Sequence, residues 1–554
     1  MEKTMNLLQK LEMKLKEGKL KFIFFLLLFI TLPTQAKDKF EDTIYFRKSF
    51  TLTLKKNGRF INNDTLLTKQ KTGKWKVNKN TLELTTINQN LDTISKYPII
   101  FNSKNKIVLT KESKRYAYHD KISAKGSNIT FISILRGLLG ISMLFFIGYI
   151  FSKDKKNINW KLVLRGTIIQ IILALIILKV PFVSVIFDWL SKAFTKIINF
   201  SHDGAEFLFK SMSSNQIDPI LMNFVTWILP SIIFFAAISS LLYYFGILQW
   251  IIKRLAWFMN KTLGISGAES ISAAANIFIG QTEAPLLVKP YLKRMTKSEI
   301  MCLMVGGMAT IAGGVLAAVI GILGEGDQMK ELFYAKHLLT ASFMSAPAAI
   351  VFSKILVPET NQINKNLDVP KEKIGSNSLE AITNGTIDGL KLAANVGAML
   401  LVFMSLIALV NYTLGKVGDW TSLNDIIASG GMYTKLSFES IAGYLLAPIS
   451  WLMGVEWQDC MYFGQLLGEK TILNEFIAYP HLGNIQDELS KKTIIMSTYV
   501  LCGFANIASI GIQVGGIGVL IPEKKSLLAK YGFKALIGGT LASMSTAILA
   551  GILF

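Results

Sequence analysis

Cysteine and histidine are scarce in this sequence, which has three cysteines and four scattered histidines. The cysteines, Cys302, Cys460 and Cys502, lie in or beside apolar segments, so the polar N-terminal part has no disulfide framework. No spacing of histidine, cysteine and carboxylate residues is typical of a zinc site. These shortages argue against a hydrolytic metalloenzyme.

Acidic residues are also few, with 37 Asp and Glu against 59 Lys and Arg and a formal net charge of +22. A strongly basic chain can indicate a nucleic-acid-binding protein. Here the basic residues fall in an N-terminal polar segment and in short loops between apolar segments, without a recognisable nucleic-acid-binding fold. We therefore expect no nucleic-acid partner.

Apolar runs of helical length are abundant, and the chain is 51% hydrophobic with a mean hydropathy of +0.42. About 20 apolar residues span a bilayer core of about 30 Å as a helix. The sequence therefore predicts a polytopic α-helical membrane protein with about eight spans. The segment 185–209 mixes aromatic and charged residues, which predicts an amphipathic helix in the membrane interface. The expected spans are 131–152, 161–181, 222–247, 300–323, 337–357, 388–414, 494–520 and 533–553.

The N-terminal residues 1–36 have the pattern of a signal peptide. Basic residues from Lys19 to Lys21 precede the apolar run Phe22–Leu32, and small residues lead to Ala36. We expect cleavage after Ala36. Retention of the segment as an anchor, or a start at Met13, are the alternatives.

Residues 37–128 have a different pattern, with alternating apolar and polar residues in Phe50–Leu54 and around Trp75. Asn57-Gly58 is a typical hairpin turn. The segment predicts a small antiparallel β domain, weakly similar to lipocalin-like domains. A ligand pocket is one interpretation, and a closed scaffold or docking module is the other.

Basic loops predict the orientation of the membrane part. The loops 152–156, 289–297, 370–373 and 522–525 all fall on one side if each expected segment crosses once and residues 276–290 return to their own side. Lys and Arg mark the cytoplasmic face. The β domain and the C-terminus are then extracytoplasmic, at a plasma (inner) membrane.

Two polar blocks, Asn276–Pro285 and Leu473–Pro480, stand between the apolar segments and contain Glu283 and Glu475. An ionisable group at membrane depth costs a few kcal/mol and usually lines a substrate or ion path. The blocks therefore predict a substrate site, although each carboxylate could instead form an ion pair or lie at the interface. Asp388 is expected to be a charge at a helix N-terminus, and Arg136 to reach the interface or to pair.

The two blocks belong to a repeat. Gly307–Gly313 matches Gly503–Ser509 at four of seven positions, and each follows its Glu-containing block with inverted topology. Gly-interrupted segments at corresponding places in two halves indicate a transporter site. Coincidence in a Gly- and Ala-rich chain is the alternative.

Each block predicts a re-entrant hairpin, in which Gly280 gives the tip conformational freedom and Pro285 starts the returning helix. The amide, hydroxyl and carboxylate of Gln281, Thr282 and Glu283 suit a neutral solute with many hydrogen-bonding groups. The acceptor-rich set of the other half, Glu475, Asn506 and Ser509, suits vicinal hydroxyls.

Blander roles are available for several of these side chains. Asn506 and Ser509 could be polar contacts between helices. Thr310 could bond its own helix backbone, and Val315 and Phe504 could serve packing alone.

Three motifs in order, Asn276–Leu286, Asn474-Glu475-Phe476 and Gly503–Ser509, resemble the concentrative nucleoside transporter family. The resemblance covers residues 130–554 and leaves out the N-terminal domain. It implies eight spans, two re-entrant hairpins in an inverted repeat, an interfacial helix and a homotrimer. The implied divisions are 129–220 (first spans and interfacial helix), 221–420 (first repeat with scaffold helices) and 421–554 (second repeat and last span).

The resemblance also implies a non-enzymatic function, the import of nucleosides by a sodium-driven symporter of the elevator type. Two rival classes remain. A membrane enzyme with Glu283 and Glu475 as acid and base lacks a nucleophile or a metal cluster. The other class is a sensor, and the sequence shows no cytoplasmic signalling domain that would support it.

The resemblance assigns the site as follows. The nucleobase would meet Gln281, Thr282, Glu283, Val315 and Phe504, and the ribose would meet Glu475, Asn506 and Ser509. The coupling sodium ion, with no other cofactor, would be bound by Asn276, Ile279, Thr310 and Ile311. Thr310 stands where the family's pattern has Ser, and it keeps the hydroxyl. Proton coupling is the alternative, and base preference stays open.

Overall fold

The computed structural model describes residues 43–47, 50–54, 59–62, 72–78, 81–86, 93–103, 106–111, 114–119 and 130–554, the last range without 210–223, 368–374 and 430–431. The expected signal peptide, residues 1–36, lies outside the described residues.

The N-terminal domain is a closed antiparallel barrel in which each strand pairs with the next and β1 pairs with β8. The β6–β7 pairing shifts register between Ile99 and Phe101. The strands are β1 (Thr43–Arg47), β2 (Phe50–Leu54), β3 (Arg59–Asn62), β4 (Thr72–Asn78), β5 (Thr81–Thr86), β6 (Thr93–Ser103), β7 (Lys106–Lys111) and β8 (Lys114–His119).

Apolar side chains at alternate positions along the strands fill the interior of the barrel. Leu52 and Leu54 of β2 are fully buried, as are Leu82 and Leu84 of β5. Successive strand residues point to opposite faces, so these alternate positions line the interior. The predicted antiparallel β domain is confirmed.

The helical part begins with two apolar helices, α4 (Phe131–Ile150) and α5 (Trp160–Lys179). Arg136 of α4 donates through one guanidinium nitrogen to the carbonyls of Trp451, at 2.7 Å, and Val455, at 2.9 Å, so it pairs with backbone of a neighbouring helix. The long amphipathic helix α6 (Pro181–Phe209) follows, four residues longer at its start than the predicted interfacial helix.

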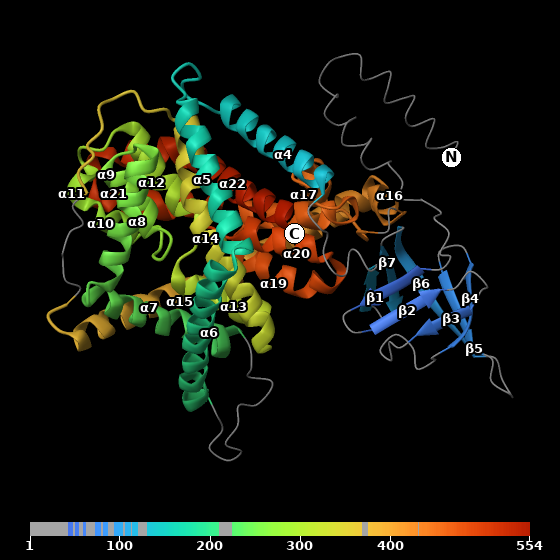
Figure 1. Cartoon of the computed structure of the whole chain (residues 1–554). Helices are drawn as coiled ribbons and strands as arrows, with labels where there is room; N and C mark the ends of the chain where they lie inside the picture. Colours follow the sequence, from blue (N-terminus) through green and yellow to red (C-terminus); the bar gives the residue numbers. More distant parts are fainter. Residues whose placement is uncertain are drawn as a thin grey trace.

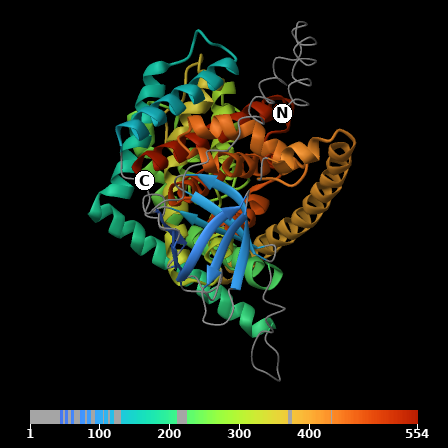
Figure 2. The same ribbon diagram turned by 90° about the vertical axis from the view of Figure 1, so that its right-hand side faces the viewer.

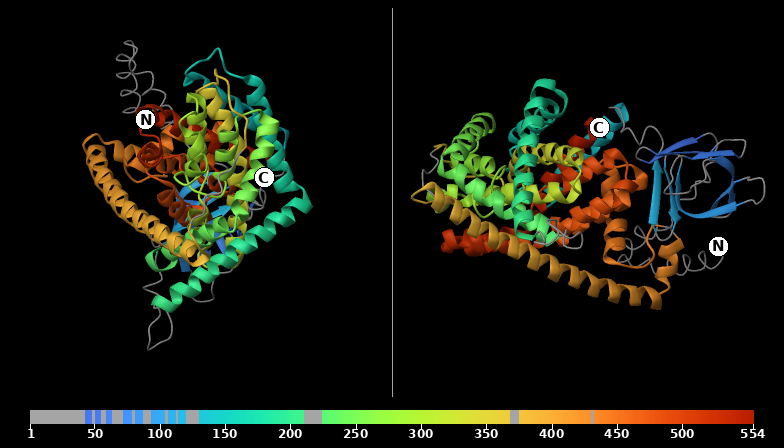
Figure 3. Two further views of the ribbon diagram at one scale, coloured as in Figure 1. Left: turned by 90° about the vertical axis from the view of Figure 1, so that its left-hand side faces the viewer. Right: turned by 90° about the horizontal axis from the view of Figure 1, so that it is seen from below.

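The next span is bent. A π turn (Phe224–Ile228) leads into α7 (Leu229–Tyr244), which meets α8 (Ile247–Leu263) at 77°. Gly246, between them, has a φ of 75°, a conformation that favours glycine. α7 packs along α15 (Ser378–Trp420), a helix of 43 residues that stays largely exposed on the outside of the helical part (Figure 3).

Two broken helices and two continuous ones form the core. One broken helix is α12 (Lys297–Ala309) and α13 (Gly313–Gly324), and the other is α20 (Lys491–Leu501) and α21 (Ile507–Leu520). Both contact the continuous helices α14 (Gln328–Leu356) and α22 (Lys525–Leu553). The two breaks cross, because a Cβ added to Gly503 would lie 2.7 Å from the carbonyl oxygen of Ala309.

Each broken helix has a helical hairpin beside it, as the repeat predicts. Hairpin 1 consists of α9 (Gly267–Ala275), α10 (Ala284–Leu287) and α11 (Lys289–Leu292). Hairpin 2 consists of α18 (Cys460–Ile472), α19 (Glu475–Ile485) and the short η5 (Gln486–Glu488). The remaining short elements are α16 (Leu423–Ser429), α17 (Phe438–Leu452), η4 (Trp457–Asp459) and η6 (Pro522–Lys524).

Six helices of the described residues are long and apolar enough to cross a membrane, or up to seven if the bent pair α7–α8 is one span. The broken helix α12–α13 is counted as one of them, whereas the expected span 494–520, which residues 502–506 divide into α20 and α21, is not. The polytopic helical fold is confirmed.

The barrel lies at one end of the molecule in Figure 1 and faces the viewer in Figure 2. Its strand β8 contacts η5, at the end of hairpin 2. The N-terminal domain therefore contacts the end of hairpin 2.

Candidate functional site

The base of hairpin 1 is held by capping and by a buried ion pair. Ser266 and Glu269 form a capping box at the start of α9, with each side chain bonded to the other's backbone nitrogen. Lys354 of α14 forms an ion pair with Glu269 and donates to the Ser298 hydroxyl at 2.9 Å. Hairpin 1 is thereby tied to both α14 and α12 at the end away from its tip.

At the tip, Pro285 lies in the first turn of α10, as the sequence predicts. Gly280 does not have a positive φ, so its predicted conformational freedom is not used. A Cβ at Gly280 would instead meet the carboxylate of Glu283 and displace this flexible side chain from its position. Glycine lets that carboxylate fold over the tip.

A continuous hydrogen-bond chain joins the two hairpins. Asn506 donates to Glu475 Oε2 at 3.0 Å, and its own Oδ1 accepts from the Ser509 backbone nitrogen at 2.8 Å. Gln281 then donates to Ser509 Oγ at 3.1 Å. All four side chains are buried, so every bond in the chain is shielded from water.

This hydrogen-bond chain brings together one predicted nucleobase residue, Gln281, and all three predicted ribose residues. Gln513 of α21 extends it by donating to Gln281 Oε1 at 3.1 Å and to the Met304 carbonyl at 3.0 Å. Gln513 was not predicted as a site residue. The available signal was an amide in the middle of an otherwise apolar, glycine-rich helix.

Three of the other four predicted nucleobase residues occupy different positions. Thr282 faces α21, because a Cβ at Gly516 would lie 3.1 Å from its methyl group. Val315 is buried on α13, and Phe504 is half-buried in the second break against the same apolar core.

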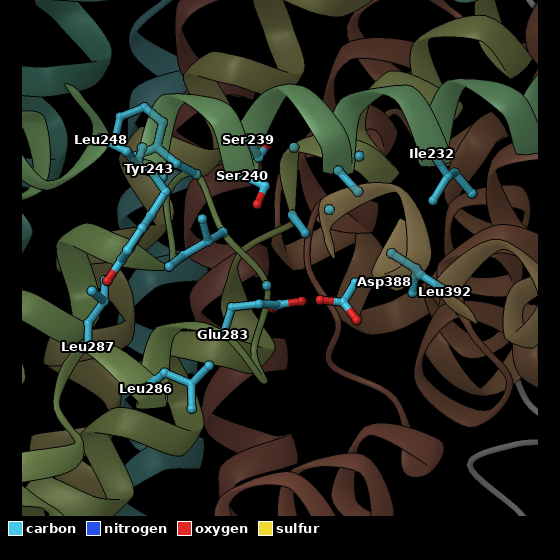
Figure 4. A pocket seen from close by; sticks show the side chains of 18 residues that line it. Ile232, Ser239, Ser240, Tyr243, Leu248, Glu283, Leu286, Leu287, Asp388 and Leu392 are labelled. Atoms are coloured by element: carbon cyan, nitrogen blue, oxygen red, sulfur yellow. The ribbon is translucent and has the colours of Figure 1, made fainter. Parts of the chain in front are cut away.

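Glu283 is not a member of the hydrogen-bond chain and lines a cavity of about 350 Å³ beside α7 and α15. Asp388 of α15 points toward it from the opposite wall (Figure 4). The expectation that Asp388 is an N-terminal helix charge is wrong, since α15 begins at Ser378. Asp388 lies nearly three turns inside the helix at 3.6 residues per turn.

The residues predicted to bind sodium lie around the tip of hairpin 1 and the first break. The Oδ1 atom of Asn276 is buried and has no hydrogen-bond partner. The Thr310 hydroxyl donates to the carbonyl of Gly306 at 2.9 Å, which leaves its lone pairs free to accept a cation.

The backbone at this point also offers oxygen. The carbonyls of Ile277 and Phe278 accept hydrogen bonds from Ser342 and Gly313. Those of Asn276, Ile279 and Ile311 accept none within the described part of the chain. Uncharged oxygens of this kind fit a small alkali cation.

Paired hairpins, crossed helix breaks and polar side chains that meet between two repeats define a secondary transporter of the inverted-repeat class. Comparisons with known proteins identify the family. Residues 139–212 match the model of the Na+ dependent nucleoside transporter N-terminus, residues 225–326 match "Nucleoside recognition", and residues 337–551 match the Na+ dependent nucleoside transporter C-terminus.

Curated relatives agree with these matches. The nucleoside permease NupC of Helicobacter pylori is 40% identical over 428 residues, which cover 76% of this chain and 98% of that protein. Solute carrier family 28 member 3 of Rattus norvegicus is 39% identical over 432 residues, 75% of this chain. The match spans 58% of that longer relative.

Solved structures show the same fold. CNTnw in an inward-facing substrate-bound state has a TM-score of 0.68 and 35% sequence identity, over 76% of this chain and 98% of that one. A CNTnw variant in an outward-facing state has a TM-score of 0.69 over the same shares. The chain belongs to the concentrative nucleoside transporter family, whose members are transporters and not enzymes.

Proposed function

We propose that this protein is a secondary active symporter that imports nucleosides, driven by a sodium gradient. The observation that carries the proposal is the buried hydrogen-bond chain between the two hairpins. Family membership and the sodium-dependent names of the matching models support it.

Glu475 and Asn506 would bind the ribose. The carboxylate accepts one hydrogen bond from Asn506 and has further lone pairs for two hydroxyl donors. Ser509 would contribute a hydroxyl that both donates and accepts. Each of these bonds exchanges for a bond to water or to another side chain, so each contributes only about 1 kcal/mol, and more where it reaches the charged carboxylate.

Gln281, Thr282 and Glu283 would face the nucleobase, with Val315 and Phe504 as apolar neighbours. Gln281 is bonded to Ser509 and to Gln513, so a base that bonds to its amide must exchange one of these contacts. This exchange would link occupation of the base subsite to the position of Ser509 in the ribose subsite.

Sodium would bind through Asn276, Thr310 and the carbonyls of Asn276, Ile279 and Ile311. The unpartnered Oδ1 of Asn276 supports this assignment, because a buried polar atom without a partner is costly unless a ligand satisfies it. A proton-coupled mechanism through a carboxylate is the second candidate.

Transport would proceed by an elevator movement. Hairpin 1 and the two broken helices pack on α14 or α22, and hairpin 2 packs on α13 and α20, which makes one block; α7 and α15 pack closely on each other. The block would move against the α7–α15 pair. The exposed apolar side chains along α15, such as Leu401, Leu409 and Trp420, are suited to contacts with lipid or with two further subunits of a homotrimer.

We also propose the cellular arrangement. Residues 1–36 would be a signal peptide and residues 37–128 an extracytoplasmic domain. The C-terminus would lie on the same side of a plasma (inner) membrane. The implied divisions at 129–220, 221–420 and 421–554 belong to the same proposal.

Uptake of labelled uridine into proteoliposomes tests the function. Three conditions are compared: an inward sodium gradient, an inward proton gradient and no gradient. We expect accumulation driven by sodium. Accumulation driven only by protons would move coupling to a carboxylate, and no flux of uridine, cytidine or adenosine under any condition would refute nucleoside transport.

A further inference from the structure

The cavity beside hairpin 1 is built from two different parts of the molecule. Glu283 comes from the hairpin, Asp388 comes from α15, and Ser239, Ser240 and Tyr243 come from α7. Its volume of about 350 Å³ is in the range of small-molecule sites. A residue on α15 therefore shares a cavity with a carboxylate of the proposed nucleobase subsite.

Close packing of α15 on α7 fixes the position of Asp388. A Cβ at Gly385 would lie 2.6 Å from Ser240 Cβ, and one at Gly389 would lie 2.8 Å from the Cα of Ile233. Residues three and four positions apart share a helix face, so Asp388 follows Gly385 on the side of α15 that meets α7. The close backbone contact fixes the place of the Asp388 backbone beside the cavity.

The carboxylate of Asp388 is open to a ligand. Its one ion pair in the described chain is with Lys391 Nζ, at 3.5 Å, and the two side chains are 75% and 71% exposed. An exposed pair of this kind contributes little. Asp388 and Glu283 point toward one another across the cavity (Figure 4).

Two facing carboxylates select for hydrogen-bond donors. Ionised carboxylates only accept hydrogen bonds, so a ligand relieves their repulsion by presenting an N–H group to each. Cytosine and adenine carry an exocyclic amino group with two N–H bonds, and carboxylates are known acceptors for the cytosine amino group. Uracil presents a carbonyl oxygen at the corresponding position, which a carboxylate disfavours.

We propose that Asp388 is a specificity-determining residue that favours nucleosides whose base carries an exocyclic amino group. Asp388 accepts one N–H of that group and Glu283 accepts the other. The inference rests on the proposed nucleoside transport and adds the base preference. It also makes α15 a wall of the substrate site.

The test compares uptake of cytidine, adenosine and uridine by the full-length chain in proteoliposomes, for the wild type and D388N. The wild type should have a lower KM for cytidine and adenosine than for uridine. D388N should raise the KM for cytidine and adenosine by about tenfold, equivalent to about 1.4 kcal/mol. The KM for uridine should stay the same or fall, because the asparagine amide can donate to a uracil carbonyl.

K391M is the matched control, because it removes the ion-pair partner of Asp388 without touching the cavity lining. It should leave the ratio of cytidine to uridine KM at the wild-type value. Retained uridine uptake shows that D388N is folded.

Three outcomes overturn the assignment. The first is a cytidine-to-uridine KM ratio in D388N within about twofold of the wild type. The second is loss of uptake of all three nucleosides in D388N, which would place Asp388 in the transport movement instead. The third is a wild-type chain that transports none of them, which removes the proposed function together with this inference.

Discussion

Replacement of Glu475 by glutamine removes one negative charge from a buried site with little change in volume. Glu475 is 3% exposed, and its Oε2 accepts from Asn506 at 3.0 Å. Glutamine keeps one acceptor oxygen, so the contact to Asn506 can persist. The change is therefore confined to bonds in which the negative charge takes part.

The magnitude follows from the number of such bonds. A hydrogen bond to a charged group contributes about 1.5–3 kcal/mol, against about 0.5–1.5 for a neutral pair. If two ribose hydroxyls donate to Glu475, E475Q loses about 3 kcal/mol of binding, a weakening on the order of a hundredfold. Uptake at a substrate concentration near the wild-type KM should then be almost abolished, while the oligomeric state is unchanged.

The assay is sodium-driven uridine uptake over a range of concentrations, with size-exclusion chromatography of the same preparations. E488Q is the matched control. Glu488 is a buried glutamate at the end of the same hairpin, where its Oε2 accepts from the Tyr462 hydroxyl at 2.6 Å. E488Q should keep the wild-type KM. Wild-type uptake by E475Q would remove Glu475 from the site.

Three further predictions concern other parts of the molecule. N276L should raise the sodium concentration for half-maximal uptake by about tenfold through loss of the Asn276 oxygen; an unchanged sodium titration would contradict the ion site. G503A should lower the melting temperature, because Gly503 has a φ of 126° and the added Cβ would meet the Ala309 carbonyl. The control G515A should not lower it, because a Cβ at Gly515 would have no heavy atom within 4 Å. Equal melting temperatures for the two variants would be inconsistent with crossed breaks. Cysteines introduced singly along β8 should form a disulfide with one at position 486, detectable on non-reducing gels because the three native cysteines are buried; failure of every pair would refute the barrel contact.

Local sequence patterns predicted the elements that depend on local chemistry. The alternating strands of the barrel, Pro285 in the first turn of α10, and the broken helices at the two Gly-containing motifs are all present. In each case the pattern expresses a backbone or burial preference that neighbouring elements do not change.

Predictions that depended on neighbouring helices were less successful. The role of Asp388 was wrong because the apolar run 388–414 hid the polar first turns of α15, which continue the helix back to Ser378. Gln513 was missed because its hydrogen bond to Gln281 depends on the packing of α21 against hairpin 1. The role of Gly280 was misassigned because its φ is not positive and its neighbour is the Glu283 carboxylate, which only the folded hairpin tip places there.

The crossed breaks have an electrostatic consequence. At each break one helix ends and another begins, so the C-termini of α12 and α20 and the N-termini of α13 and α21 meet near Gly503 and Ala309. A helix terminus carries a partial charge of about half an elementary charge, negative at the C-terminus and positive at the N-terminus. The centre of the molecule thus has separate regions of both signs that belong to the peptide backbone itself. A cation and a polar solute can be bound side by side there with few ionised side chains, and both depend on the same interruptions of the two helices.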